Sequence, residues 1–266
     1  MLALYQILVL ALVQGITEFL PISSSGHLVI TSQLLGWPDQ GLTLDIAVHI
    51  GTLLAVMLYF WRDLGALFVG LGRTVTHRKG RERDLFLNVV IATVPVLAAG
   101  WFARDYVEHY FRSVELIAWT TIGFGILLWI ADQVGLTVRR VEHIGWGGAL
   151  TIGLSQILAL VPGTSRSGIT MTAARFLGME RSEAARFSML VSIPVIGAIG
   201  GYTALEVVLA GNLPLTLEFG VAVGLSFLAA LVAIWAMMAW LRRASFTAFA
   251  VYRLLLGGFL LWWVYS

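Results

Sequence analysis

Six long apolar stretches constrain the fold of this chain most strongly, because each is long enough to cross a lipid bilayer. They lie at roughly 43–61, 85–103, 114–131, 187–209, 217–241 and 247–265. A helical span needs about 20 apolar residues. Only 12% of the residues are charged, which is about half the share of a soluble domain. The chain is therefore predicted to be an all-α, polytopic integral membrane protein, with residues 1–266 forming one membrane domain.

Two further apolar stretches, at 2–20 and 146–161, each run into one copy of a repeated segment. The copies cover residues 14–36 and 156–178, a constant offset of 142 positions. Each copy breaks at a proline and a Ser/Gly cluster, then continues as a short segment that ends at glycine, a signal for a helix C-terminus. Neither short helix could cross a bilayer. We expect two re-entrant helix pairs, whose broken backbone must be buried in protein or line a wet cavity.

The distribution of Lys and Arg orients the chain in the membrane. Loops rich in these residues lie at 62–84, 132–145 and 242–243, and the leaner loops lie at 104–113 and 210–216. Basic loops remain in the cytoplasm, which places both termini outside. Three spans separate the two copies, so the copies should enter from opposite sides. This pattern predicts an inverted repeat with halves at about 1–131 and 146–266.

Charge and cysteine content exclude several functions. The formal net charge is only +2, which gives no support to nucleic-acid binding, and the chain has no Cys. The absence of Cys excludes disulfides, thiolate metal sites and Cys nucleophiles.

The first copy opens its short helix with Ser23-Ser24-Ser25-Gly26-His27. Helix N-termini present unpaired N–H groups and a partial positive charge, so they bind anions, and the Ser hydroxyl groups add donors. Plain N-capping is the structural alternative, because Ser caps helices well. The recurrence of the same cluster at a fixed offset favours anion binding.

The second copy adds a cation to this arrangement, in the sequence Ser165-Arg166-Ser167-Gly168. A guanidinium group can hold a phosphate through two parallel hydrogen bonds. The structural alternatives for Arg166 are snorkelling to the interface or pairing with an acid. Because Gly and Ser flank it on both sides, we predict that Arg166 binds phosphate.

Glu18 lies one helical turn after Gln14, so the two side chains project from one face. An ionisable residue in an apolar stretch is costly and is a candidate for function. Glu18 could be a metal ligand, a general base or a structural partner of Arg166. Gln156 repeats Gln14 in the second copy, which favours a scaffold hydrogen bond for Gln156 and leaves the role of Gln14 open.

His27 could act as a nucleophile or a proton donor, because imidazole titrates near neutral pH, or it could be a satisfied buried imidazole. Three positions separate it from Ser24, so both could face the same phosphate. Three other polar residues, Asp45, His49 and Arg253, are expected to be structural. Arg253 should pair with a buried acid or a carbonyl.

The charge balance of the site predicts a metal. If the anion is a pyrophosphate, Arg166 and two helix N-termini do not neutralise it beside Glu18. A divalent cation that bridges Glu18 and the phosphate oxygens would complete the balance.

The paired motifs also carry a resemblance. Gln14-x-x-x-Glu18 with Pro21-Ile-Ser-Ser-Ser-Gly-His27, and Pro162-Gly-Thr-Ser-Arg-Ser-Gly-Ile-Thr170, closely resemble those of the bacterial undecaprenyl-pyrophosphate phosphatase family of the bacitracin-resistance type. The resemblance covers essentially the whole chain. It implies hydrolysis of a C55 lipid pyrophosphate to the monophosphate carrier for cell-wall polymers. It also implies a divalent cation, Mg²⁺ or Ca²⁺, and competition by bacitracin for the substrate.

The same resemblance implies a location and residue roles. The protein would lie in the bacterial cytoplasmic (inner) membrane among membrane lipid, with a site that opens to the periplasm, and a homodimer is left open. Glu18 and Gln14 would serve the metal, or Glu18 would activate a nucleophile, either Ser24 or His27. Because the residue at position 14 is Gln, it has no carboxyl group for a direct acid role. The expected phosphate contacts are Arg166 with Ser23, Ser25, Gly26, Ser165, Ser167 and Thr170.

A transporter is the alternative, because inverted repeats with broken helices at the membrane midplane also build transporters. It could be a lipid flippase or an anion carrier, and an enzyme of this fold could also return the carrier lipid inward. The asymmetry of the copies favours the enzyme. Glu18, Ser24 and His27 in the first copy align with Leu160, Arg166 and Ile169 in the second. This difference indicates that the two copies contribute different catalytic groups.

Overall fold

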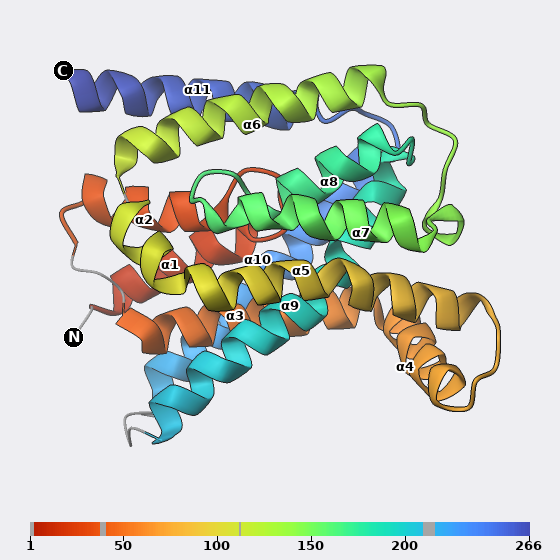
Figure 1. Ribbon diagram of the computed structural model, residues 1–266. Coiled ribbons are helices and arrows are strands. Elements are labelled where there is room, and N and C mark those ends of the chain that lie inside the picture. The colour runs from red at the N-terminus through yellow and green to blue at the C-terminus, as the bar shows by residue number, and fades with distance from the viewer. Residues whose placement is uncertain (1–2, 38–40, 112, 210–215) are drawn as a thin grey trace.

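Every named element in the described residues is a helix (Figure 1). The computed structural model describes residues 3–37, 41–111, 113–209 and 216–266, and within 104–110 it describes the backbone alone. The elements are α1 (Leu4–Thr17), α2 (Ser24–Leu34), α3 (Gly41–Tyr59), α4 (Trp61–Val75), α5 (Arg81–Tyr110), α6 (Val114–Val134), η1 (Val141–His143), α7 (Trp146–Ser155), η2 (Gln156–Leu160), α8 (Arg166–Phe176), α9 (Arg181–Leu209), α10 (Leu217–Leu241) and α11 (Thr247–Tyr265).

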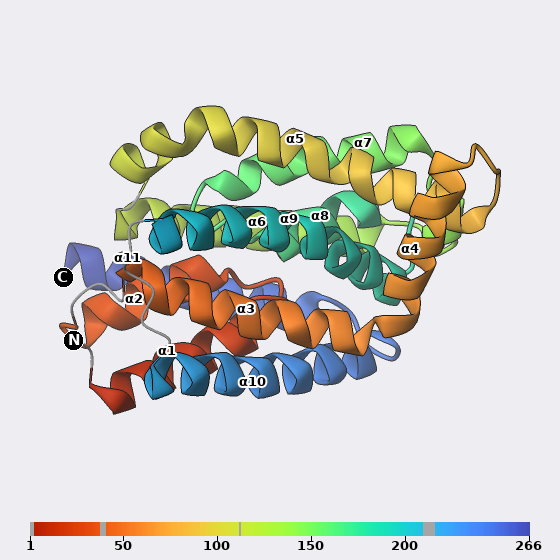
Figure 2. The same ribbon diagram turned by 90° about the horizontal axis from the view of Figure 1, so that it is seen from below.

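The six predicted membrane spans are confirmed. Among the described helices, α3, α5, α6, α9, α10 and α11 are long and apolar enough to cross a bilayer, and their long axes share one general direction (Figure 2). Large apolar side chains are exposed on these helices, for example Phe102 at 87% and Leu255 at 70%. Exposed apolar surface of this extent marks contact with lipid or protein rather than water.

Helix α4 was not predicted, because its segment was interpreted as a basic loop over 62–84. Figure 2 shows α4 crossing one end of the molecule at a steep angle to the long helices. It packs against α5 and is tied to α9 by an ion pair between Asp63 and Arg186. Its charged residues are not typical of a membrane span. Its exposed Phe68 suits a helix that lies at a membrane surface.

The two repeated segments fold as broken helix pairs of matching design. Helices α2 and α8 both contain 11 residues and begin and end at the same offset of 142 positions. Their N-cap residues, Ser23 and Ser165, both have positive φ, of 74° and 71°. Each cap hydroxyl accepts a hydrogen bond from the backbone N–H three residues later. The predicted terminal glycines, Gly36 and Gly178, have φ of 62° and 82°, the left-handed conformation that ends helices.

The broken pairs enter the molecule from opposite ends and turn back in its interior (Figure 1). Each pair packs in part on the other half of the chain: α1 contacts α10, and α7 together with η2 contacts α5. The two halves are therefore interlocked, and residues more than 140 positions apart meet where the breaks lie.

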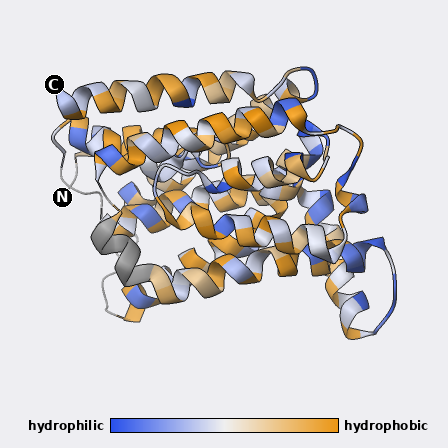
Figure 3. Ribbon diagram, turned by 45° about the horizontal axis from the view of Figure 1, so that its top comes forward, coloured by the Kyte–Doolittle hydropathy of each residue, from blue (hydrophilic) through white to orange (hydrophobic). Residues whose placement is uncertain are grey.

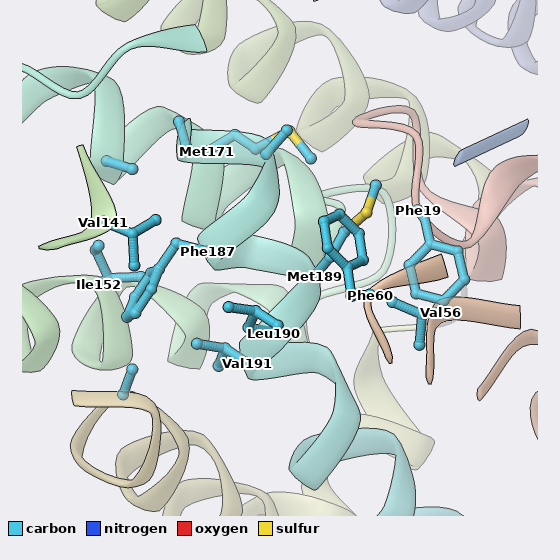
Figure 4. Packing of buried hydrophobic residues seen from close by; sticks show 14 of the residues in the cluster. Phe19, Val56, Phe60, Val141, Ile152, Met171, Phe187, Met189, Leu190 and Val191 are labelled. Carbon is cyan, nitrogen blue, oxygen red and sulfur yellow. The ribbon is translucent and has the colours of Figure 1, made fainter. Parts of the chain in front are cut away.

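Buried apolar side chains hold the first break in place. Phe19 follows directly after Glu18 and is fully buried. It lies in the main core cluster with Val56, Phe60 and Met189, and Figure 4 shows its ring directed toward the first two of these residues. Inside a membrane protein such contacts stabilise through van der Waals packing, so the packed ring anchors the backbone that carries Glu18.

Candidate active site

A cavity of about 450 Å³ lies beside the two breaks. Its polar wall comes from α1, the start of α2, α3 and the start of α8, and the polar side chains that form this wall are Gln14, Glu18, Ser24, Ser25, Asp45, His49 and Arg166. Its apolar wall includes Leu28, Ile46, Ile117, Ile196 and Ile199. The cavity therefore combines a compact polar end with a longer apolar surface.

Glu18 is the centre of the polar end. Its Oε2 accepts hydrogen bonds from the Ser24 hydroxyl at 2.6 Å and from Nε2 of Gln14 at 3.0 Å. Its Oε1 accepts a hydrogen bond from Arg166 at 3.2 Å. Glu18 as a whole is 9% exposed. A buried carboxylate with three donors is held in one orientation, and the charge of Arg166 offsets its burial.

Arg166 is the first residue of α8 and reaches the cavity from the second half of the chain. One guanidinium nitrogen bonds Glu18. The other terminal nitrogen, Nη1, is buried and has no hydrogen-bond partner in the described part of the chain. A buried donor without a partner is costly, so this nitrogen is a natural contact for an anionic ligand.

Ser24 is the first residue of α2. The backbone N–H groups of a first helical turn lack acceptors within the helix, and they add a partial positive charge. Ser24 and Ser25 both line the cavity. An anion in the cavity would therefore meet hydroxyl groups, a helix N-terminus and Arg166 together.

His27 occupies a different environment from Ser24, and the expectation that both face the same phosphate stays a prediction. His27 is absent from the cavity wall. Its Nδ1 donates to the Ser23 carbonyl at 2.6 Å, its Nε2 bonds the Tyr252 hydroxyl at 2.6 Å, and its ring stacks on that of Tyr252. Both ring nitrogens are engaged on the side of α2 that faces α11.

Most of the other predicted phosphate contacts build the breaks instead of the cavity wall. The Ser23 and Ser165 hydroxyls cap their helices through Gly26 and Gly168, as in the N-capping alternative. Ser167 donates to the Leu20 carbonyl, and Thr170 bonds Ser188 and the backbone of its own helix. Among the predicted set, only Ser25 and Arg166 line the cavity. The Ser167 and Thr170 hydroxyls thus donate to backbone carbonyl groups. Sequence spacing alone does not reveal such side-chain-to-backbone bonds.

Arg253 fixes both breaks at once, as its structural interpretation predicted. Its side chain is fully buried and donates to carbonyl groups of Pro21 in the first break and of Gly163 and Thr164 in the second. It also donates to the Thr121 carbonyl of α6. Broken backbone leaves carbonyl groups without helical donors, and one guanidinium with five N–H groups satisfies several of them.

Two residues of the cavity wall were underestimated from the sequence. Asp45 and His49 were expected to be structural, yet both line the cavity, and His49 lies 3.2 Å from the Nε2 of Gln14. Their position one turn apart on an apolar span was the available signal. Gln156, in contrast, forms the expected scaffold bond, donating to the Ala92 carbonyl at 2.7 Å.

The residues around Glu18 fit a divalent cation only if the substrate shares in binding it. In the described part of the chain, no group of three or more His, Cys, Asp or Glu side chains is placed to hold a metal. The Oε1 atom of Gln14 is buried without a hydrogen-bond partner, next to Glu18. One carboxylate and one amide oxygen suit Mg²⁺ or Ca²⁺ that takes its other ligands from water and phosphate oxygens.

These features define a class of protein: a polytopic helical membrane protein with an acid–serine–arginine site between two broken helices. The family described as bacitracin resistance protein BacA matches residues 7–259 of the chain. The chain belongs to this family.

Three relatives are similar in sequence to this chain over nearly its full length. The undecaprenyl-diphosphatase of Teredinibacter turnerae is 47% identical over 255 residues, covering 96% of this chain and 97% of that protein. The undecaprenyl-diphosphatase of Jannaschia sp. is 48% identical over 261 residues, covering 97% and 98%. That of Alcanivorax borkumensis is 48% identical over 264 residues, covering 98% of each chain.

Proposed function

We propose that this protein hydrolyses undecaprenyl pyrophosphate to undecaprenyl phosphate and inorganic phosphate, which recycles the lipid carrier of cell-wall synthesis. The 2.6 Å hydrogen bond from the Ser24 hydroxyl to Glu18 carries the proposal, because it joins a nucleophile to a base inside a cavity that also contains Arg166. A Ser hydroxyl becomes a useful nucleophile when an adjacent base takes its proton. The names of the relatives supply the substrate.

The geometry supports a two-step reaction. Ser24 Oγ attacks the terminal phosphorus while its proton passes to Glu18, and the anhydride P–O bond breaks to release the lipid monophosphate. Glu18 passes this proton to the leaving lipid monophosphate. A water molecule then attacks the phosphoserine while Glu18 takes one of its protons, the P–Oγ bond breaks, the proton returns from Glu18 to Ser24 Oγ, and inorganic phosphate leaves. Arg166 and the N-terminus of α2 bind the phosphate oxygens and stabilise the charge of the transition state. His27 supports α2 through its bonds to Ser23 and Tyr252.

The apolar wall suits the lipid part of the substrate. Side chains of α2, α3, α6 and α9 contribute Leu28, Ile46, Ile117 and Ile196 to it. A polyprenyl chain reaches this wall from the lipid, so it is held by van der Waals packing and not by transfer out of water. The apolar wall would contact the chain while the polar end binds the pyrophosphate.

A divalent cation would be held by Glu18 and the Oε1 atom of Gln14 together with substrate oxygens. When bound, such an ion acts as a Lewis acid on a phosphoryl oxygen and offsets its charge. This role agrees with the single carboxylate of the site, since Mg²⁺ usually relies on one or two carboxylates plus substrate phosphates.

An enzyme explains the site better than a pure transporter does. A carrier needs a binding site but no nucleophile. In the polar end, Glu18 of the first half bonds both Ser24 of the same half and Arg166 of the second, and the two halves therefore contribute different groups. Return of the product lipid across the membrane remains compatible with the two oppositely entering helix pairs.

The simplest test of the function is phosphate release by the purified protein. Farnesyl or undecaprenyl pyrophosphate should yield inorganic phosphate and the corresponding monophosphate. Excess chelator should abolish the reaction, and added Mg²⁺ or Ca²⁺ should restore it. Absence of phosphate release would refute the proposed function. Full activity in chelator would exclude only the divalent cation from the mechanism.

The orientation of the cavity gives a second test. Asp45 and His49 lie in the first half of α3 and Ile199 lies in the last part of α9, so the cavity is nearer the end with both termini (Figure 1). Hydrophilic residues gather around α4 at the opposite end (Figure 3). The positive-inside rule makes the α4 end cytoplasmic, and a site near the other end would open to the periplasm of the inner membrane.

Single Cys residues can report this topology because the chain has none. Lys79→Cys, in the basic turn after α4, should resist an impermeant thiol reagent in intact spheroplasts and react after permeabilisation. Glu218→Cys, exposed in the first turn of α10, is the control and should react from outside. Labelling of Lys79→Cys in intact cells would reverse the assignment. The predicted outside loop at 210–216 lies outside the described residues, apart from Thr216.

A further inference from the structure

His49, Gln14 and Glu18 form a hydrogen-bonded chain that ends at the proposed base. Nε2 of Gln14 lies 3.0 Å from Glu18 Oε2 and 3.2 Å from His49 Nε2. Nδ1 of His49 lies 2.7 Å from the backbone carbonyl oxygen of Asp45. Gln14 is fully buried, and His49 is partly buried in the cavity wall.

The contacts determine which atom carries each proton. A carbonyl oxygen only accepts, so His49 Nδ1 donates to Asp45. Gln14 must turn its NH₂ group toward Glu18, because the reversed amide would place its oxygen against a carboxylate oxygen. The second N–H of the same group then faces His49 Nε2, which must be the acceptor nitrogen of a neutral imidazole.

We propose that His49 is a positioning residue for the hydrolysis: it accepts a hydrogen bond from Gln14 and thereby holds the amide that aims Glu18 Oε2 at Ser24. This inference rests on the proposed function, in which Glu18 takes the proton of Ser24. Glu18 Oε2 has two donors, Gln14 and Ser24. A Gln14 side chain held at only one of its two N–H groups can rotate, and Glu18 then loses its fixed orientation.

The same arrangement explains the unpartnered Oε1 atom of Gln14. Because both N–H groups are engaged by Glu18 and His49, the amide oxygen is left as an acceptor without a donor, in a residue that belongs to the cavity wall. His49 therefore also fixes the orientation of Gln14 Oε1, the atom that we assign, together with Glu18, as a ligand of the cation that the substrate also binds. Loss of His49 should lower kcat and leave KM nearly unchanged, because Arg166 and the apolar wall still bind the substrate.

Two conservative variants separate this role from simple space filling. His49→Gln places an amide oxygen near the former Nε2 position, whereas His49→Asn reaches only the Nδ1 position. We expect His49→Asn to lower kcat about tenfold, the effect of about one lost hydrogen bond, with KM within about twofold of wild type. His49→Gln should recover most of kcat. Equal losses in the two variants, both folded by thermal melting in detergent, would overturn the proposal.

A double-mutant cycle tests whether His49 acts through Gln14. Gln14→Met keeps the length of the side chain and removes the amide. In that background His49→Asn and His49→Gln should have equal kcat, because there is no N–H left to accept. A tenfold difference that persists without Gln14 would contradict the proposal. A wild-type protein that releases no phosphate would refute the proposed function instead, so the two failures are distinguishable.

Discussion

Glu18→Gln should lower kcat for phosphate release by at least about a hundredfold, the lower bound for loss of a positioned base. Gln keeps the shape of the side chain, but it cannot take the proton of Ser24, to which Glu18 is bonded at 2.6 Å. It also removes the charge that faces Arg166 at 3.2 Å. The measurement is steady-state phosphate release from farnesyl pyrophosphate at saturating divalent cation.

The matched control is Glu142→Gln, which makes the same chemical change at an exposed residue in η1. It should leave kcat unchanged. If Glu18→Gln does not fold, Glu18→Asp carries the test, because it keeps the charge and withdraws it by one methylene group. Near-normal kcat in a folded Glu18→Gln protein would show that Glu18 is only a structural partner of Arg166.

Arg166→Lys should lower kcat/KM at least about tenfold, roughly 1.4 kcal/mol of transition-state stabilisation, although the charge is kept. Arg166 uses one nitrogen to hold Glu18 and has a second, unpartnered nitrogen for phosphate. The single ammonium group of Lys cannot reproduce this planar pair of donors. Steady-state kinetics would measure the loss.

Arg140→Lys provides the control for Arg166→Lys, because Arg140 forms a surface ion pair with Glu180 and its side chain is 64% exposed. Such pairs contribute little, so its kinetics should match those of wild type. If Arg166→Lys behaves in the same way, Arg166 does not bind the transferred phosphate.

The spans and the two breaks could be predicted from the sequence because each depends on local pattern. Apolar runs of about 20 residues specify spans in a bilayer, and α10 and α11 lie where the pattern placed them. The repeated segments gave the positions of α2 and α8, and Gly36 and Gly178 gave their ends. Gln14 and Glu18 share a face because helix geometry brings residues four apart together.

The remainder of the site depends on tertiary contacts that spacing does not encode. His49 meets Gln14 from 35 positions away, so its place in the cavity follows from how α3 packs on α1. His27 bonds the hydroxyl group of Tyr252, 225 positions later in the chain, a contact that spacing cannot predict. Helix α4 was missed because its charges exclude a span while its apolar face still favours a surface helix.

The central claim is that Ser24 forms a phosphoenzyme with Glu18 as its base, and rapid acid quench tests it most directly. Substrate labelled in the terminal phosphate should give an acid-stable phosphoserine that maps to Ser24. The label should be absent in Ser24→Ala and retained in His27→Gln. An acid-labile, base-stable phosphoenzyme on His27 would contradict this account, as would no phosphoenzyme together with inversion at phosphorus, which would indicate direct attack by water.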